Sequence, residues 1–394
     1  MSTSAAATRE PLAGWPELDD TVRRVAVLVL RRGQVSRADL AREMGMSTGS
    51  LTRVTKPLLA AGLVLEGSAQ RLRGTGRPSL PLEVNPDRAA FVGVNITGSM
   101  VYAVLTDLRG DVRDFRHLPV TDPSTTAVVE QIAGLVRDWR EHRPGLAGVG
   151  VALGARVVGW RTVVEATYLG WRDVDLAGEL SRRLGLPVAV ENDVHAFTQA
   201  AHLFGPGRGA SSLAVVTLGV GVGAGAVTHD QLLVGSPSQA GAVGHLPLLG
   251  GTADCHGSDH VGCAQAELST SAVEDKAAAR LGRRVDVPEL LALARGGDRP
   301  AREVVEQCAH QLGVLAGTMV AVLGPQVVFL SGDGIDLARA APGRVREGML
   351  RVAPGQPQPS LVIDEEFSFD AWARGAAATA ILHTLTGRMP AVAS

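Results

Sequence analysis

The chain has 394 residues, of which 45% are hydrophobic, 20% charged and only 4% aromatic, so it can form two or three domains with buried cores. Its net charge is only −2, but residues 20–90 hold 12 Arg or Lys against 6 Asp or Glu, so this segment carries +6 and is suited to a polyanion. Lysine occurs only at Lys56 and Lys276, which excludes the phosphate loop that ends in Gly-Lys-Ser or Gly-Lys-Thr.

The terminal and cysteine patterns predict a cytoplasmic location. Residues 1–17 are rich in Ala, Ser and Thr and are expected to be a disordered tail, and Met1 to Glu10 show no secretory signal. An odd number of cysteines in a long chain argues against a disulfide framework. The uncharged run from Gln307 to Gly332 is long enough to span a membrane, but Gly324 and Pro325 divide it, so a buried helix followed by a buried strand is favoured.

Residues 18–84 predict a winged helix-turn-helix. Three segments with helical spacing end at Gly33, Gly45 and Gly62, and the second and third begin at the N-cap candidates Ser36 and Ser47. A tight turn before the third helix is typical of a module that places this helix in the DNA major groove.

The polar start of the third helix is expected to contact base edges, and two strand-like pieces after it enclose a basic wing suited to phosphates. The expected contacts are Ser47, Thr48, Ser50, Thr52 and Arg53 on the helix, and Arg71, Arg73 and Arg77 in the wing. Three-helix modules also bind proteins, and basic loops are often only solvated. The order of elements together with the charge favours double-stranded DNA.

From residue 90 onward, strands alternate with helices. The segments beginning at Ala90 and Ser212 both read as strand, glycine-rich turn and strand. Two related units about 120 residues apart predict a duplicated α/β fold with two lobes and a cleft.

Several motifs in this order resemble the ROK family of repressors, open reading frames and sugar kinases, and in particular its transcription regulators. They are the winged helix-turn-helix ending "GRP", then "LGWRDVDLAGELSRRLGLPVAVENDVHAF", "TLGVGVGAG", "AGAVGHLPL" and "WARGAAATA". The resemblance implies an actin-like, ribonuclease-H-like domain over residues 88–388 that binds a sugar or related metabolite in its cleft.

The family kinases use two aspartates, and the resemblance places Asp193 at the position of the catalytic base. Asn95 stands where the first glycine turn of a kinase has the aspartate that helps to hold ATP and Mg²⁺. An amide brings no negative charge to a magnesium ion, so loss of kinase activity is expected.

The implied sugar site also departs from the family pattern. Ala242 and Gln265 stand where the family has carboxylates, and His195 replaces an asparagine. The remaining expected effector contacts are Asn192, Asp193, His245 and Gln265. The alternatives are that Asp193 only caps a helix and that His195 is an ordinary surface histidine.

The segment after His245 has the residue types of a tetrahedral zinc site. His245, Cys255 and Cys263 match the family's histidine and two of its cysteines, while the middle cysteine is absent. His260 is preferred over His256 as the fourth ligand, which gives structural Zn²⁺ in a Cys₂His₂ site. The alternative is a degenerate loop with two buried thiols.

These observations predict a DNA-binding regulator, expected to be a repressor, that acts as a homodimer or tetramer under control of a sugar-like effector. One alternative is an ATP-dependent sugar kinase with an added DNA-binding domain. A second is a regulator that uses the larger domain for dimerisation alone.

Overall fold

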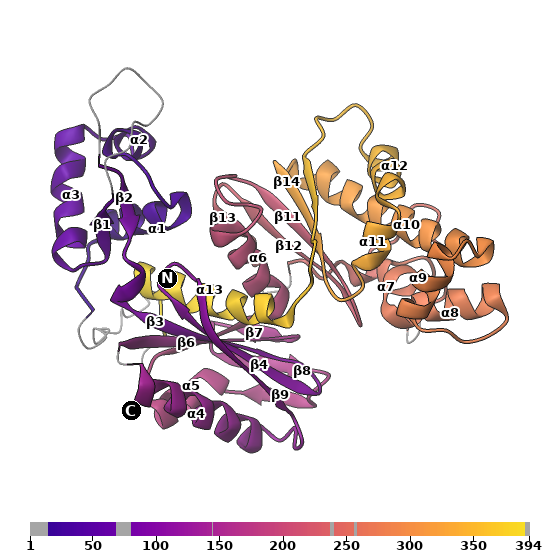
Figure 1. Cartoon of the computed structure of the whole chain (residues 1–394), viewed down its shortest axis with the longest axis horizontal. Helices are drawn as coiled ribbons and strands as arrows, with labels where there is room; N and C mark the ends of the chain where they lie inside the picture. The colour runs from indigo at the N-terminus through magenta and orange to yellow at the C-terminus, as the bar shows by residue number, and fades with distance from the viewer. Residues whose placement is uncertain (1–14, 68–79, 144, 237–239, 256–257, 391–394) are drawn as a thin grey trace, which may run out of the picture. The chain divides into compact units, whose positions relative to one another are not determined.

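The computed structural model describes residues 15–67, 80–143, 145–236, 240–255 and 258–390. The chain divides into two compact units, here called unit 1 (residues 1–204 and 369–394) and unit 2 (residues 205–368) (Figure 1). The predicted α/β class is confirmed, because unit 1 and unit 2 each contain a five-stranded sheet with helices. Residues 1–14 of the expected tail and the wing residues Arg71, Arg73 and Arg77 lie outside the described residues.

Unit 1 begins with the predicted helix-turn-helix. Its elements are α1 (Asp20–Arg32), α2 (Arg37–Glu43), α3 (Thr48–Ala60), β1 (Val64–Glu66) and β2 (Leu82–Val84). The side chains of Asp19, Ser36 and Ser47 cap the three helices by accepting backbone N–H bonds. The strands β1 and β2 pair antiparallel at the base of the expected wing.

The main sheet of unit 1 has the strand order β10-β6-β3-β4-β5. Its strands are β3 (Ala90–Ile96), β4 (Met100–Asp107), β5 (Val112–Pro119), β6 (Leu146–Leu153) and β10 (Val188–Asn192). Figure 1 shows α4 (Thr125–His142) and α5 (Leu176–Leu184) on one face and α13 (Phe369–Thr386) on the other. Since both faces are covered, β3 and β6 are apolar along most of their length.

A short helix, a small sheet and one further helix complete unit 1. They are η1 (Pro86–Arg88), β7 (Arg156–Val158), β8 (Thr162–Ala166), β9 (Trp171–Val174) and α6 (Asp193–Phe204). No sequence pattern marked the small sheet, because β7 and β9 are only three and four residues long.

Helix α13 lies directly on the main sheet because the sheet residues that face the helix at the closest contacts are glycines. A Cβ on Gly93 would lie 2.0 Å from the carbonyl oxygen of Ala373, and one on Gly150 would lie 1.8 Å from that of Ala376. On the α6 side, a Cβ on Gly375 would lie 2.8 Å from the backbone of Ala196. Small residues thus hold the backbones of α13, α6 and two strands in close contact.

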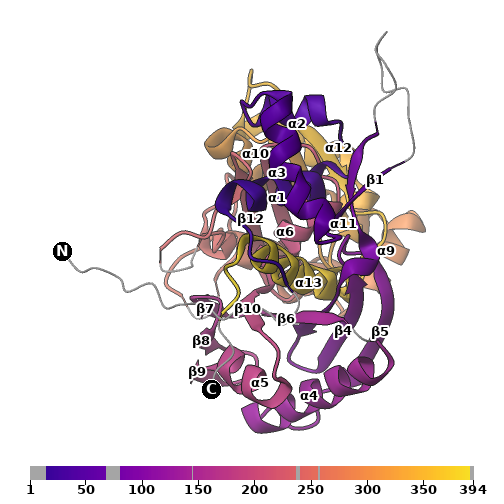
Figure 2. The ribbon, with the colours of Figure 1, turned by 90° about the vertical axis from the view of Figure 1, so that its left-hand side faces the viewer.

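The helix-turn-helix shares its hydrophobic core with the rest of unit 1. Val25 and Val29 of α1 belong to the same buried cluster as Ile381 and Leu385 of α13. Figure 2 shows α1 above α13, and Arg23 donates to the carbonyl of Thr386 at 3.1 Å. The helix-turn-helix, here called the head (residues 18–84), is therefore packed onto the rest of unit 1 and not joined to it by a free linker.

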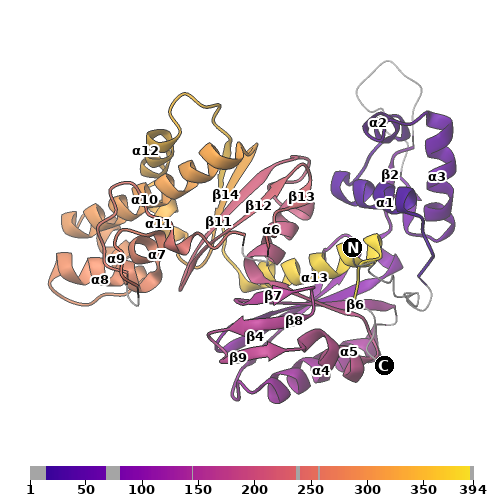
Figure 3. The same cartoon turned by 180° about the vertical axis from the view of Figure 1, so that it is seen from behind.

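Unit 2 also contains a five-stranded sheet, with the strand order β13-β12-β11-β14-β15. Its strands are β11 (Leu213–Leu218), β12 (Val222–Thr228), β13 (Gln231–Leu232), β14 (Val327–Ser331) and β15 (Ser360–Ile363). Its helices, which Figure 3 shows from behind, are η2 (Val243–His245), α7 (Ala264–Leu268), α8 (Thr270–Leu281), α9 (Val287–Arg295), α10 (Arg299–Leu323), α11 (Asp336–Ala340) and α12 (Pro342–Val352).

The uncharged run divides as expected into the end of α10 and the buried strand β14. Gly313 and Gly317 of α10 face α12 closely, since a Cβ on Gly313 would lie 2.1 Å from the carbonyl oxygen of Val345. Among the described residues, no helix has the length and apolar character needed to cross a membrane.

Candidate functional site

The first turns of α3 present a polar, solvent-facing surface. Ser47, Thr48, Thr52 and Arg53 are exposed and Ser50 is partly exposed. Ser47 accepts the backbone N–H of Ser50 at 3.1 Å, and the Thr52 hydroxyl donates to the carbonyl of Thr48 at 2.9 Å. Beneath them, Leu51 and Leu58 are fully buried, which fixes the helix on the head.

Three parallel strands of unit 1 end side by side next to Asp193. Strand β6 pairs with both β3 and β10, and Leu153 is level with Ile96 on one side and Asn192 on the other. The carboxyl ends of parallel strands commonly bear ligand sites in α/β folds. Asn192 and Asp193 therefore occupy a favoured position for a binding site.

Asn192 caps the start of α6. Its side-chain oxygen accepts the N–H of His195 at 3.1 Å, and its amide donates to the carbonyl of Ala155 at 3.2 Å. Capping is thus performed by Asn192, while Asp193 accepts the adjacent N–H of Val194 at 2.8 Å. The Asp193 carboxylate retains further acceptor capacity, which a ligand hydroxyl could use.

The Asp193 carboxyl ionises less readily than an ordinary aspartate. Burial raises its pKa from 3.8 to about 6, and the hydrogen bond from Val194 only partly opposes this effect. Perturbed carboxyls of this kind are typical of binding and catalytic sites.

Tyr168 is a neighbour of this site that sequence reasoning missed. A Cβ on Gly154 would lie 3.4 Å from Oδ2 of Asp193 and 3.9 Å from Cδ2 of Tyr168. The tyrosine is 62% exposed, although it follows the buried strand residue Ala166 by only two positions. The available signal was an aromatic residue close to a glycine in a chain with only 2 tyrosines.

Two residues lie differently from the sequence expectation. Asn95 is within β3 and only 1% exposed, because it pairs with Tyr102 and Ala152 before the turn begins at Thr97. The surface alternative for His195 is wrong: this side chain is 2% exposed, and its Nδ1 lies 3.4 Å from the Glu191 carboxylate. Asn95 is buried because β3 is the central strand of a sheet that helices cover on both faces.

The glycine turn of unit 2 between β11 and β12 is held by Gln265. The amide oxygen of Gln265 accepts the N–H of Val222 at 3.0 Å, and its nitrogen donates to the carbonyl of Val220 at 3.1 Å. The amide thus supports the turn directly. His245, the other expected effector contact in unit 2, is exposed at the end of η2.

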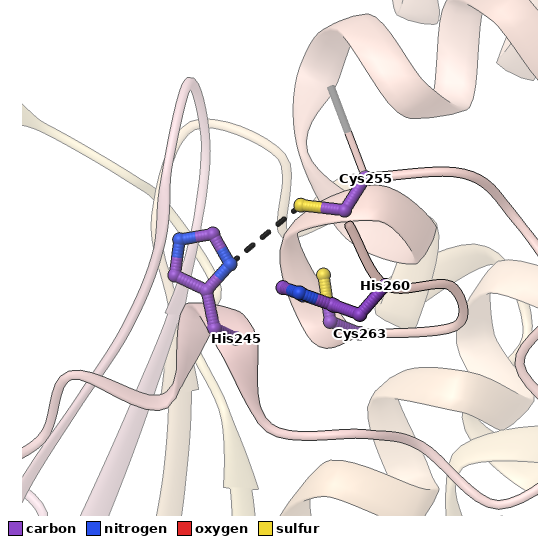
Figure 4. Close-up of side chains that lie close together, drawn as sticks. All are labelled: His245, Cys255, His260 and Cys263. Carbon is purple, nitrogen blue, oxygen red and sulfur yellow. Dashed lines mark hydrogen bonds between the residues drawn. The ribbon is translucent and has the colours of Figure 1, made fainter. Parts of the chain in front are cut away.

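His245, Cys255, His260 and Cys263 form a cluster able to hold a metal ion (Figure 4). Their four ligand atoms lie within 4.8 Å of one another, and Sγ of Cys255 is 3.6 Å from Nδ1 of His245. The two thiols are buried and the two imidazoles exposed. His256, the alternative fourth ligand, lies outside the described residues.

The cluster is supported by a tightly folded loop. The backbones of Gly251 and Gly262 approach so closely that a Cβ on either would lie within 2.5 Å of the other's carbonyl oxygen. The buried Glu267 accepts the N–H groups of Thr252 and Ala253 at 2.6 and 2.8 Å and pairs with Lys276. A carboxylate therefore anchors the loop from behind.

The model of the family described as "ROK: ROK family" matches residues 91–382, most of the chain. The chain belongs to the ROK family. A curated relative in Bacillus subtilis, named a xylose repressor, is 22% identical over 78% of this chain and 80% of its own length.

Solved structures agree in fold with this ROK protein. A ROK family transcriptional regulator described as a homologue of Escherichia coli Mlc has a TM-score of 0.76 at 22% identity, covering 94% of this chain and 96% of its own. A Streptomyces griseus ROK glucokinase, solved with glucose and AMPPNP, has a TM-score of 0.62 at 23% identity, covering 73% and 98%. The match to the regulator includes the amino-terminal region, whereas the match to the kinase covers a smaller share of the chain.

Proposed function

We propose that this ROK protein is a DNA-binding transcriptional repressor controlled by a sugar or related small metabolite. The observation that carries the proposal is the exposed polar face of α3 on a helix-turn-helix that is packed onto a ROK domain. The xylose repressor that it resembles over 78% of the chain supports the same role. Such a protein acts on operator DNA in the cytoplasm, as a homodimer or tetramer whose heads match repeated half-sites.

Operator binding tests this function directly. A double-stranded DNA library is selected on the purified protein, and the enriched sequence is titrated by fluorescence anisotropy. The Arg53→Ala variant is expected to lose roughly tenfold or more in affinity, since one base or phosphate contact contributes about 1–3 kcal/mol.

Arg346→Ala is the matched control because Arg346 is exposed on α12 in unit 2. It removes the same charge away from the head. No enrichment of any sequence, or equal losses in both variants, would contradict DNA recognition by α3.

The proposed effector contacts are Asn192, Asp193, His245 and Gln265. The position of Asn192 and Asp193 at the ends of parallel strands supports the first pair. Isothermal titration against a panel of monosaccharides and their phosphates tests the assignment, with Asp193→Ala as the site variant. Silence throughout the panel would favour a domain used only for dimerisation.

The second candidate function, a sugar kinase, is favoured by one observation, the carboxyl of Asp193 with its pKa of about 6. Against it, Asn95 is buried in β3 and supplies no charge for a magnesium ion. We therefore propose that kinase activity is lost. ADP release from ATP, Mg²⁺ and mixed sugars is expected to equal that of Asp193→Ala, and turnover abolished by this substitution would reverse the assignment.

We propose Zn²⁺ as the metal of the cluster, because two thiolates and two imidazoles within 4.8 Å of one another suit its tetrahedral geometry. His245, Cys255, His260 and Cys263 would hold the ion. Since all four ligands come from protein, it would fix the loop and the orientation of His245 and take no part in chemistry.

A further inference from the structure

Unit 2 contains a cavity of about 720 Å³ that shares no residue with the metal cluster or the glycine turn. Helices α9, α10, α11 and α12 form its wall, and its charged lining residues are Arg295, Arg302, Arg339, Arg344, Glu306 and Asp336. Four guanidinium groups and two carboxylates leave an excess of two positive charges. Leu291, Ala294 and Val305 provide an apolar side.

Acceptors inside and outside the cavity lining satisfy only part of these guanidinium groups. From outside it, Glu347 accepts from Nη1 of Arg344 and the carbonyl of Asp364 accepts from Nε of Arg339, both at 2.5 Å. Asp336 accepts from Nη1 of Arg339 at 2.6 Å, but Glu306 lies 3.8 Å from Nε of both Arg302 and Arg344, which is beyond hydrogen-bonding distance. Nε of Arg344 and Nη2 of Arg339 are buried and have no hydrogen-bond acceptor among the described residues. The side chains of Arg302 and Arg344 are 59% and 43% exposed, so their outer N–H groups are the donors that an anion in the cavity could reach.

The start of α12 adds one backbone donor at the same place. Its N-cap residue, Ala341, has no side chain that can accept a hydrogen bond, and Ala341 and Gly343 both line the cavity. Pro342 has no N–H and the N–H of Arg344 donates to the carbonyl of Ala341 at 3.0 Å, so the N–H of Gly343 is the backbone donor at this partly positive helix end. Asp286 and Asp298, by contrast, provide side-chain caps for the neighbouring helices α9 and α10.

We propose that this cavity binds a small metabolite that carries a phosphate monoester. The phosphate would lie between Arg339, Arg344 and the start of α12, and the carbon skeleton would pack against Leu291 and Val305. A phosphate monoester has a charge near −2 at neutral pH, which the net positive wall attracts, and guanidinium groups bind its oxygens with two parallel hydrogen bonds. This second ligand site lies in unit 2 and is separate from the effector site proposed at Asp193.

Titration calorimetry of the full-length protein tests the proposal, with glucose 6-phosphate, glycerol 3-phosphate, glucose and glycerol as ligands. The Asp193→Ala background removes the effector site, and there we expect heat from at least one phosphate ester and none from its neutral counterpart. Arg344→Gln in this background is expected to weaken binding of the ester roughly tenfold or more, since a charge-assisted hydrogen bond is lost.

Arg346→Gln is the matched control, because Arg346 lies on the same helix but outside the cavity wall. Equal weakening by Arg344→Gln and Arg346→Gln would overturn the proposal, as would no binding of either ester at millimolar concentration. Arg302→Gln provides an independent test should Arg344→Gln lower the melting temperature, since the Arg302 side chain is 59% exposed. Operator binding by Arg344→Gln without ligand is expected to equal wild type, which separates this site from the proposed function.

Discussion

At the residue scale, Asp193 lies at a favourable position for ligand binding, but its surroundings disfavour the ionised carboxylate. It lies where three parallel strands end and it begins α6, yet burial raises its pKa to about 6. The carboxyl is thus partly protonated under mildly acidic conditions. The contribution of this carboxyl to the free energy of unfolding therefore depends on pH and can be measured.

We expect Asp193→Asn to remove a pH dependence of stability. Between pH 3.8 and about 6 the folded protein retains the Asp193 proton that the unfolded chain releases. The unfolded state therefore binds fewer protons, and the free energy of unfolding falls as pH rises through this window, by up to about 2 kcal/mol. Urea unfolding at pH 4.5 and pH 7.5 should show that this fall is smaller in the variant.

The control is Asp138→Asn, which changes an exposed carboxyl on α4. Its unfolding curves should follow wild type at both pH values. Parallel behaviour of Asp193→Asn and wild type would show that the Asp193 carboxyl is ionised freely in the folded protein.

A second residue-scale prediction concerns the metal. Cys263→Ala is expected to remove the bound zinc, about one ion per chain, as measured by mass spectrometry after dialysis, and to lower the melting temperature. Cys308→Ala is the control, because Cys308 is also fully buried but lies in α10 and outside the cluster. Equal zinc content in both variants would contradict the assignment.

The roles of some residues could be predicted from their local sequence, and the roles of others could not. Ser36 and Ser47 cap helices as expected, because a capping side chain acts on its own first turn. The cluster of His245, Cys255, His260 and Cys263 was also expected, since its ligands are close in sequence. The exposure of Tyr168 beside Asp193 was not, because the two residues meet only after β6, β8 and β10 have folded.

At the element scale, α13 is the helix on which unit 1 depends. It contacts α1, α6 and the strands β3 and β6, and glycine permits the closest of these contacts. The repeated strand and turn patterns predicted the two sheets correctly. They did not indicate that the last helix of the chain covers the first sheet, because a pattern within one segment holds no information about a partner so distant in the sequence.

We expect Gly93→Ala to destabilise the protein, since its Cβ would lie 2.0 Å from a carbonyl oxygen of α13. Forcing a methyl group into a packed core costs about 1–3 kcal/mol, and here it also displaces a helix backbone. Gly134→Ala is the matched control, because Gly134 is within α4 and its Cβ would meet nothing within 4 Å. It should gain about 0.5–1 kcal/mol from helix propensity.

Urea unfolding measures both variants on one scale. Equal free energies of unfolding for Gly93→Ala and wild type would mean that α13 adjusts its position at little cost.

At the scale of the whole molecule, unit 1 is assembled from two distant parts of the chain. Residues 1–204 contribute the head and the sheet, and residues 369–394 return to complete the core. The head is therefore stabilised by residues that lie at the opposite end of the sequence.

We expect truncation after Ser368 to abolish operator binding although every head residue remains. Without α13, the apolar face of α1 and one face of the main sheet lose their cover. Truncation after Pro390, which removes only residues 391–394, should bind as wild type in the same anisotropy titration. A head that recognises DNA without α13 would contradict a shared core.

The order in which a ribosome makes the chain determines when this shared core can form. Ile381 and Leu385 are synthesised after all of unit 2, and they pack in one cluster with α1, which is synthesised before it. Unit 2, by contrast, is one continuous segment from Gly205 to Ser368, so all of its residues are made before α13. A growing chain therefore cannot complete the core beneath α1 until α13 has been synthesised.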